Sequence, residues 1–206
     1  MQLVIGNKNY SSWSLRPWIA MKVLGIAFDE VRIPLYQPGS KERILGYSRA
    51  GKVPILKDGD TVIWDSLAIL EYLAEKHPQL WPSDRAQRAK ARSISAEMHS
   101  GFAKLREHMS MNARKRYPGK GRTPEVLADI ARIDAIWSEA KGPFLFGTFT
   151  AADAMYAPVV LRFRTYEVEV RKKSYMDAML ALPAMREWIE AAEREAESIP
   201  DQDLYG

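Results

Sequence analysis

The chain of 206 residues contains no cysteine and only three histidines. Without cysteine there is no disulfide scaffold, no Cys-ligated zinc site and no cysteine nucleophile. His77, His99 and His108 show no metal-ligand spacing, so we expect no metal cofactor. No apolar run approaches the roughly 20 residues that span a bilayer, and the first residues lack the pattern of a secretory signal. We expect a cytoplasmic protein without a membrane partner.

The chain also lacks a large excess of charge of either sign. It has 30 Lys and Arg residues and 26 Asp and Glu residues, a formal net charge of +4. One stretch without acidic residues, 114–122, concentrates five cations: Arg114, Lys115, Arg116, Lys120 and Arg122. A nucleic-acid site would need a recognition motif or an aromatic stacking platform beside it. The sequence shows neither, so we interpret the stretch as a solvated loop and expect no nucleic-acid partner. Weak attraction of anionic substrates toward a pocket mouth stays open.

The first third of the chain alternates between strand and helix patterns. Pro17 lies in the first turn of the first helix, where its missing N–H costs little, and Gly25 ends that helix. A Lys-Asp-Gly-Asp turn at 57–60 between two alternating runs predicts a β-hairpin. We expect strands at 2–5, 28–35, 53–56 and 61–64, and helices at 14–24, 41–45 and 67–76. This order of elements is that of the thioredoxin-like α/β fold.

The rest of the chain has only helical patterns. Two prolines and no hydrophobic period characterise residues 77–84, which is typical of a linker. Beyond it we expect helices at 85–112, 125–140, 151–163 and 182–197. The sequence therefore predicts a thioredoxin-like α/β domain at 1–77, a linker at 78–86 and an all-α domain at 87–206.

Three polar turns of the first domain carry chemistry. Tyr10, Ser11, Ser12 and Trp13 lie between the first strand and the first helix, at a strand end where α/β sheets bind ligands. The helix N-terminus there suits an anion, and a serine hydroxyl could donate a hydrogen bond to a bound thiolate. Simple N-capping by Ser11 or Ser12 is the simpler alternative.

The other two turns are Val53-Pro54 and Asp65-Ser66. A proline that opens a strand beside a ligand edge is a natural place for a cis peptide bond, although most X–Pro bonds are trans. Ser66 is expected to cap the next helix and to bind a carboxylate through its hydroxyl and N–H, while Asp65 pairs with an ammonium group. Taken alone, the pair is simply a helix cap.

The order of these turns resembles the glutathione-binding domain of the serine-type cytosolic glutathione transferases. The run from Ser11 to Arg16 is similar to the Ser-Ser-Cys-x-Trp-Arg pattern of the zeta class, and Val53-Pro54 and Asp65-Ser66 match the family's Val-Pro and Glu/Asp-Ser motifs. Thr150-Ala151-Ala152-Asp153 resembles the family's N-capping box, a structural feature. The resemblance extends over nearly the whole chain.

The resemblance implies a transferase that conjugates the thiolate of glutathione, its co-substrate, to small electrophiles, mostly apolar ones. It assigns thiolate stabilisation to Ser11 first, since Ser11 lies five residues before Arg16, then to Ser12, then to Tyr10. Lys52, Val53, Pro54, Asp65 and Ser66 would hold glutathione. The family also implies a homodimer with Asp65 near its interface. A non-catalytic ligand-binding protein, a glutathione-dependent peroxidase and a purely structural partner remain alternatives.

One departure limits the resemblance. Trp13 stands where the zeta class has cysteine, so maleylacetoacetate isomerase activity is not carried over, and a protein–glutathione mixed disulfide is excluded.

The second substrate pocket is expected to involve Trp13, His99, Phe102 and Arg106. Phe102 also belongs to an apolar stripe with Met98, Leu105 and Met109, which is more typical of a helix–helix core than of a pocket lining.

Overall fold

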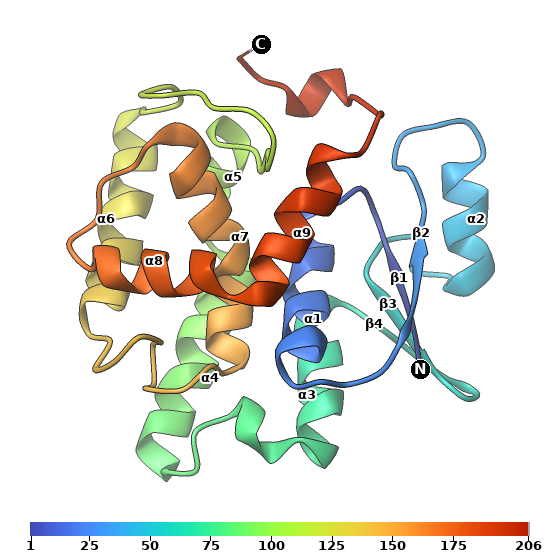
Figure 1. The fold of residues 1–206 in the computed structure, drawn as a ribbon, viewed down its shortest axis with the longest axis horizontal. Coiled ribbons are helices and arrows are strands. Elements are labelled where there is room, and N and C mark those ends of the chain that lie inside the picture. Colours follow the sequence, from blue (N-terminus) through green and yellow to red (C-terminus); the bar gives the residue numbers. More distant parts are fainter. Residues whose placement is uncertain (206) are drawn as a thin grey trace.

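The computed structural model describes residues 1–205, with a four-stranded sheet at one side and a helical body at the other (Figure 1). The strands are β1 (Gln2–Ile5), β2 (Asp29–Arg32), β3 (Ile55–Asp58) and β4 (Thr61–Trp64), in the spatial order β2-β1-β3-β4. β1 pairs parallel with β2 and antiparallel with β3, and β3 pairs antiparallel with β4. The predicted thioredoxin-like α/β arrangement is confirmed.

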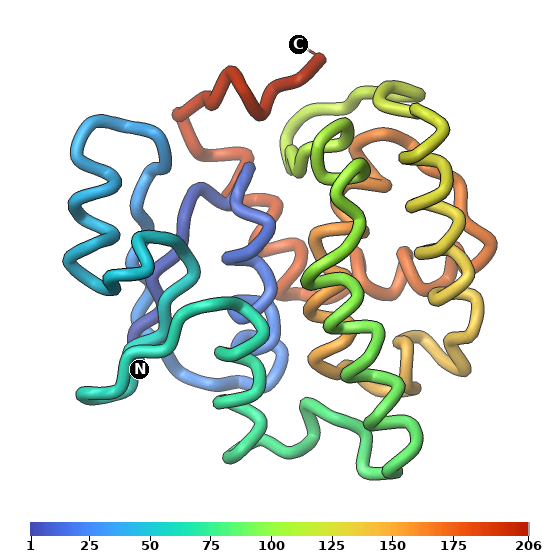
Figure 2. Tube along the Cα trace, turned by 180° about the vertical axis from the view of Figure 1, so that it is seen from behind, coloured from blue at the N-terminus to red at the C-terminus, as the bar shows by residue number. Residues whose placement is uncertain are grey.

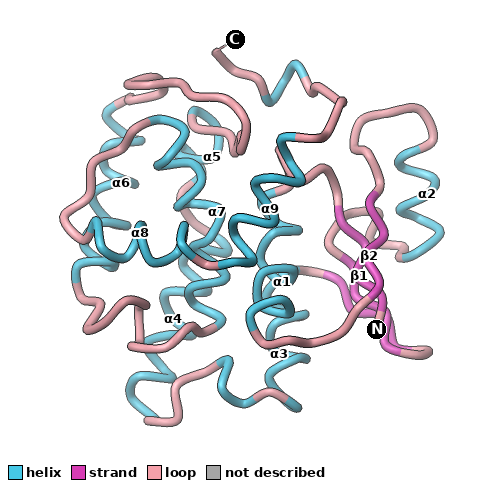
Figure 3. The backbone as a smooth tube through the Cα atoms, viewed as in Figure 1, coloured by secondary structure: helices cyan, strands magenta, loops and turns pink. Residues whose placement is uncertain are grey.

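Different helices cover the two faces of the sheet, whose strands are magenta and whose helices are cyan in Figure 3. Side chains alternate along β1, so Leu3 and Ile5 pack toward α1 (Ser12–Val23) and α3 (Ser66–Lys76), whereas Val4 packs toward α2 (Ser40–Tyr47). The larger core continues from α1 and α3 into the helical body without interruption. The sheet is thereby held against the rest of the chain by the same apolar cluster that fills it.

The helical body contains six α-helices within the described residues: α4 (Arg85–Ser100), α5 (Ala103–His108), α6 (Pro124–Ser138), α7 (Ala151–Tyr166), α8 (Lys173–Ala181) and α9 (Pro183–Glu193). Two short 3-10 turns complete the chain, at Pro78–Leu80 and Pro200–Gln202. Viewed from behind in Figure 2, the green α4 lies in front of the orange α7. Helix α7 packs against α1 on one side and α4 on another, so it is the central support of the helical body.

Helix α7 is buried along almost its whole length. Its N-terminus is closed by the predicted capping box, in which Asp153 accepts hydrogen bonds from the Thr150 N–H at 2.8 Å and the Thr150 hydroxyl at 2.9 Å. The same carboxylate accepts a third hydrogen bond from the Leu145 N–H at 3.0 Å. These contacts satisfy N–H groups that would otherwise be unpaired in the core.

The expected single helix at 85–112 is wrong, because it breaks after Ser100. Gly101 ends α4, and its missing side chain is required, since a Cβ there would lie 2.8 Å from the Glu97 carbonyl oxygen. Phe102 follows in the left-handed region, with φ of 59°, before α5 begins. The chain also forms α8, which the sequence patterns did not predict, and α9 ends at Glu193 rather than at 197.

Candidate functional site

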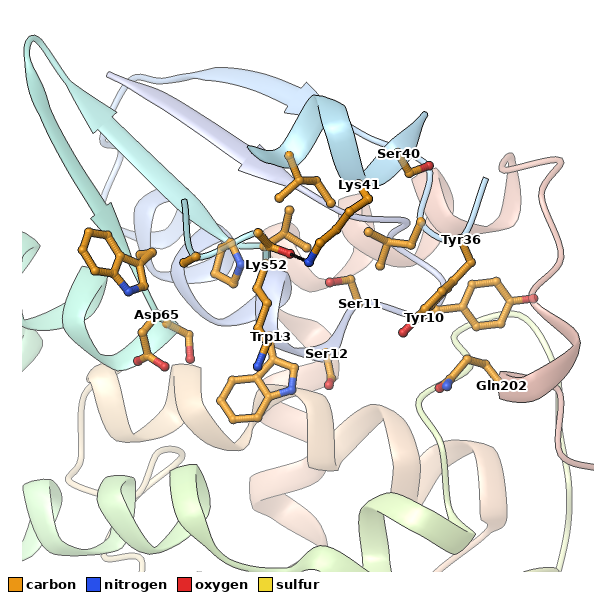
Figure 4. Close-up of a pocket in the computed structure, with 18 of the residues that line it drawn as sticks. Tyr10, Ser11, Ser12, Trp13, Tyr36, Ser40, Lys41, Lys52, Asp65 and Gln202 are labelled. Atoms are coloured by element: carbon orange, nitrogen blue, oxygen red, sulfur yellow. Dashed lines mark hydrogen bonds between the residues drawn. The ribbon is translucent and has the colours of Figure 1, made fainter. Parts of the chain in front are cut away.

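A cleft of about 750 Å³ lies between the sheet and the helical body, within the usual size range of ligand pockets. Its walls come from turns that are distant in sequence: the β1–α1 turn, the loop before α2, the segment around Val53-Pro54, the β4–α3 turn, and single residues of α5, α7 and the C-terminal segment. In the close-up of Figure 4, Asp65 lies on one side, Ser11, Ser12 and Trp13 in the middle, and Tyr10 with Gln202 on the other side. The three predicted polar turns therefore converge on one cavity.

The β1–α1 turn presents the N-terminus of α1 to this cleft. Ser11 occupies the N-cap position, yet no side chain of the described residues caps the helix. The Ser11 hydroxyl instead donates to the Ser14 hydroxyl at 2.7 Å, and the Ser14 hydroxyl accepts the Gly6 N–H at 3.1 Å. Ser11 therefore takes the predicted N-cap position without a capping hydrogen bond from its side chain, and the positive end of the helix is left available to an anion.

Tyr10 lies at the same wall, but its hydroxyl is engaged elsewhere. It donates to the Asp203 carboxylate, with O–O distances of 3.1 and 3.2 Å, and accepts from Arg114 Nη2 at 3.0 Å. A hydroxyl that already donates to a carboxylate is poorly placed to donate to a thiolate as well. Of the three hydroxyls assigned to the thiolate, those of Ser11 and Ser12 remain the better placed.

The second turn brings a peptide-like edge and Lys52 to the cleft, and α2 adds Lys41 beside it. The Val53-Pro54 bond is cis, and Val53 precedes Ile55, the first residue of β3 in the sheet ladder, so its main chain lies outside the paired strands. Lys41 donates to the Gly51 carbonyl at 3.0 Å, while the side chain of Lys52 extends toward Trp13 in Figure 4. Both ammonium groups lie in the cleft wall, where they favour a carboxylate.

The third turn is arranged differently from the expectation. Asp65, and not Ser66, is the N-cap of α3, and its Oδ1 accepts the Leu67 N–H at 2.9 Å. Asp65 holds φ of 75°, a backbone conformation that costs a non-glycine residue about 1–3 kcal/mol and is concentrated at functional sites. The Ser66 hydroxyl is fully buried and accepts a hydrogen bond from Arg16 Nη1 at 3.1 Å. Both residues nevertheless line the cleft.

The residues expected to form the second substrate pocket divide into two pairs. Trp13 and Arg106 line the cleft. His99 and Phe102 lie outside its lining: the His99 ring is 5.1 Å from that of Trp13, and its Nε2 lies 3.3 Å from Asp65 Oδ2. Phe102 packs into the core with the rest of its apolar stripe. His99 therefore contacts two residues of the site without facing its cavity.

Two further lining residues, Arg162 and Gln202, have no sequence pattern that indicates them. Arg162 lies on α7 among buried apolar residues, where a pattern of helical core positions hides it. Its side chain is 5% exposed, and Nη1 donates to the Met109 carbonyl at 2.7 Å. Gln202 belongs to the last 3-10 turn, and no local pattern places that turn beside Tyr10.

The C-terminal segment is fixed to the β1–α1 turn by charged groups. Glu195 accepts the N–H groups of Lys8 at 2.7 Å and Asn9 at 3.0 Å, and burial raises the pKa of this carboxyl. Arg114 donates to the Glu195 and Glu197 carbonyl oxygens. Arg114, expected in a solvated basic loop, thus holds the C-terminal segment in place, and this segment brings Gln202 to the cleft.

The electrostatics of the cleft are strongly cationic. Its lining contains four cations, Lys41, Lys52, Arg106 and Arg162, and a single carboxylate, Asp65. Burial and the neighbouring Arg106 lower the pKa of Arg162 to about 9, and burial also lowers the pKa of Arg106. Residues 1–205 contain no group of three or more potential His, Cys, Asp or Glu metal ligands, and none of their helices is long and apolar enough to cross a membrane.

Comparison with known proteins places this geometry in a family. The chain matches the model of the glutathione S-transferase N-terminal domain over residues 10–76 and that of the C-terminal domain over residues 86–191. It is 39% identical to maleylacetoacetate isomerase of Mus musculus over 169 residues, 78% of this chain and 77% of that protein. With the Rattus norvegicus protein of the same name it shares 29% identity over 85% of this chain and 87% of the relative.

Solved structures share the fold. A maleyl pyruvate isomerase, a bacterial zeta-class glutathione S-transferase, superposes with a TM-score of 0.73 at 21% identity, over 96% of this chain and all of the other. A glutathione transferase homologue from Burkholderia with bound glutathione gives a TM-score of 0.71 at 22% identity, over 95% and 98% of the two chains. Since the family models together cover most of the sequence and both halves of the fold, the chain belongs to the glutathione S-transferase family.

Proposed function

We propose that the protein is an enzyme that binds glutathione in this cleft and transfers its thiolate to an electrophile. The observation that supports this most is the convergence of three separate turns on one cavity: the uncapped N-terminus of α1 with Ser11 and Ser12, the Val53-Pro54 segment, and Asp65-Ser66. Each supplies a group that one part of a γ-glutamyl tripeptide requires. The family membership of the chain agrees with that assignment.

Glutathione would lie along the cleft with its γ-glutamyl end at Asp65 and its glycyl end at Lys41 and Lys52. Asp65 pairs with the γ-glutamyl ammonium group, and the N-terminus of α3 with Ser66 binds the adjacent carboxylate. The main chain of Val53 pairs with the cysteinyl residue, because it lies outside the sheet ladder. Lys52 and Lys41 then face the glycyl carboxylate. This arrangement directs the sulfur toward the first turn of α1.

Ser11 would stabilise the thiolate in this arrangement. Its hydrogen bond to Ser14 can reverse, since either hydroxyl can rotate its proton. Ser14 then donates to Ser11 while it still accepts the Gly6 N–H, and Ser11 donates to sulfur. A thiol with an ordinary pKa near 8.5 is mostly protonated at neutral pH, so hydrogen bonding to the thiolate and the helix N-terminus together increase the reactive fraction. Ser12 is the alternative donor.

The thiolate absorbance of bound glutathione, titrated against pH, tests the proposal. Wild-type protein should lower the thiol pKa of bound glutathione, and Ser11→Ala should raise it by about one unit, equivalent to about 1.4 kcal/mol. Ser12→Ala, the adjacent matched control, should shift it less. An equal pKa in Ser11→Ala and wild type would remove Ser11 from this role, and the absence of any saturable heat of glutathione binding would remove the enzyme proposal.

An isomerase that uses glutathione is the second candidate, because the mouse relative at 39% identity is named maleylacetoacetate isomerase. The two activities differ in what happens to glutathione: a transferase consumes one molecule per turnover, and an isomerase regenerates it. Titration of free thiol during turnover therefore separates them. Trp13, which stands where the zeta class has cysteine, lines the cleft beside the proposed thiolate and favours the transferase.

A homodimer, with Asp65 near the interface, is part of the same proposal. Sedimentation equilibrium at micromolar concentration would report it directly, and a monomer under those conditions would refute it.

A further inference from the structure

Three arginines gather where the helical body meets the cleft. Arg106 of α5 and Arg162 of α7 line it, and Arg16 of α1 lies behind Trp13. The guanidinium carbons of Arg16 and Arg106 lie 4.2 and 5.1 Å from the centre of the Trp13 ring. The indole thus holds two cations beside each other at the floor of the site.

This arginine cluster has no carboxylate in direct contact, although the charges of Asp65 and Asp129 partly offset the lowering of the pKa of Arg16 and Arg106, respectively. Within residues 1–205, none of the three guanidiniums takes part in a salt bridge. Arg106 is held by the Gly101 and Met98 carbonyl oxygens, and Arg162 by that of Met109. Arg16 Nε and Nη2 are buried without a hydrogen-bond partner. Burial lowers the pKa of each arginine, and repulsion from Arg106 lowers it further for Arg16 and Arg162.

The charge balance of the cleft points the same way. Four lining cations and one carboxylate leave a net charge of 4 − 1 = +3. Glutathione in its thiolate form brings two carboxylates, one ammonium group and the sulfur, a net charge of −2, so a positive charge remains after it binds. The helical body lines the cleft through Arg106, Arg162 and Gln202, and none of these is an apolar side chain.

We propose that Arg106 and Arg162 form a binding site for an anionic group on the electrophilic co-substrate, a carboxylate or a group of similar charge and shape. The site rests on the proposed function and replaces the expectation of a mostly apolar electrophile. The planar guanidinium forks of the two arginines match the two oxygens of a carboxylate. An anion there also relieves the repulsion among the three arginines, which a neutral substrate of the same size cannot do.

A matched pair of aryl chlorides tests the charge preference. 4-Chloro-3,5-dinitrobenzoate and 4-chloro-3,5-dinitrobenzamide differ at one group and react in the same way: the glutathione thiolate forms the C–S bond, the C–Cl bond breaks, and chloride leaves with the bonding electron pair. The kcat/KM of each, divided by its uncatalysed rate constant with glutathione, gives a selectivity ratio. Since a hydrogen bond to a charged group is worth about 1.5–3 kcal/mol, we expect wild type to favour the carboxylate roughly ten-fold or more.

Substitution of each arginine identifies the source of that preference. Arg106→Gln and Arg162→Gln should each lower the selectivity ratio roughly ten-fold, because the carboxylate substrate loses a charged partner that the amide lacks. Arg162→Lys keeps the charge and provides a second measurement at the buried position if the glutamine variant does not fold. Arg116→Gln, an exposed arginine outside the cleft lining, is the matched control and should leave the ratio unchanged.

A binding measurement separates this site from the glutathione site. 3,5-Dinitrobenzoate, which has no leaving group, should bind to glutathione-free wild-type protein at least ten-fold more tightly than 3,5-dinitrobenzamide in calorimetry, and this difference should disappear in Arg106→Gln. Equal binding of the two compounds, no binding of either, or a selectivity ratio that both arginine variants leave unchanged overturns the proposal. If wild-type protein prefers 3,5-dinitrobenzoate but does not bind glutathione, only the proposed transferase activity is refuted.

Discussion

The buried carboxyl of Asp153 should make the stability of this protein depend on pH in a way that one substitution removes. Its side chain is fully buried at the start of α7 and accepts three hydrogen bonds, from Leu145 and Thr150. Burial raises its pKa to about 6, although these hydrogen bonds oppose the rise. In the unfolded chain the same group has an ordinary pKa near 3.9.

The direction in which stability changes with pH follows from that difference between the two pKa values. Because the folded-state pKa is the higher one, the folded protein binds the proton more tightly, and the resulting stabilisation is fully present below about pH 4 and is lost as the pH rises through about 6. Between pH 7 and pH 5 the group should therefore add about 1.3 kcal/mol to the free energy of unfolding. Asp153→Asn cannot take up the proton, so its unfolding free energy should lack this increment.

Urea unfolding of wild type and Asp153→Asn at pH 7, 6 and 5, followed by tryptophan fluorescence, measures the effect. The asparagine variant should be less stable at every pH because a single carbonyl oxygen replaces two acceptors. The decisive quantity is the difference between the two proteins, which should grow by about 1.3 kcal/mol from pH 7 to pH 5. Asp177→Asn, at an exposed position of α8, controls for general charge effects. A constant difference between wild type and Asp153→Asn would refute the reasoning.

Three further substitutions test the site and its supports. Asp65→Asn keeps an N-cap acceptor and should retain stability, whereas Asp65→Ala should lose about 1 kcal/mol; both should weaken glutathione binding in calorimetry, and unchanged affinity in both would exclude the ammonium contact. Asp203→Ala removes a hydrogen-bond partner of Tyr10 and should speed amide hydrogen exchange in residues 198–205 but not in α7, so equal exchange of that segment would contradict its proposed anchoring. Trp188→Phe leaves the buried Lys8 carbonyl without its 2.8 Å donor and should lower the unfolding free energy by about 1–3 kcal/mol in urea titration, a loss that an unchanged midpoint would disprove.

The sequence predicts those parts of the fold that depend on local patterns. The βαβ order, the hairpin at 57–60 and the capping box at Thr150 each follow from residues that are close in the chain, and the structure contains all three. Family resemblance supplied what local patterns could not, namely that the turns at Ser11, Val53 and Asp65 belong to one site. Their arrangement around a single cleft agrees with that prediction, while the role of each residue stays a proposal.

The failures have physical causes. The apolar period of α4 continues past Gly101, so a pattern of spacing alone does not show that the backbone turns there, even though a glycine is a common helix end. Arg162 is hidden because a buried helix has no polar face against which a charged residue would stand out. Contacts such as Tyr10 with Asp203, 193 positions apart, depend on tertiary packing and have no local sequence signal.

The hydrogen bonds from Lys8 and Asn9 to Glu195 have a consequence for the order of assembly. Lys8 and Glu195 are 187 positions apart, and a ribosome makes the chain from its N-terminus. The turn before α1 therefore lacks the Glu195 carboxylate, which accepts its N–H groups, until nearly all of these residues have been synthesised. The sheet can form early from local pairing, but the loop that leads into α1 acquires its final shape only when α9 has docked. A nascent chain halted before residue 195 should therefore be folded in its sheet and still unable to retain a tripeptide.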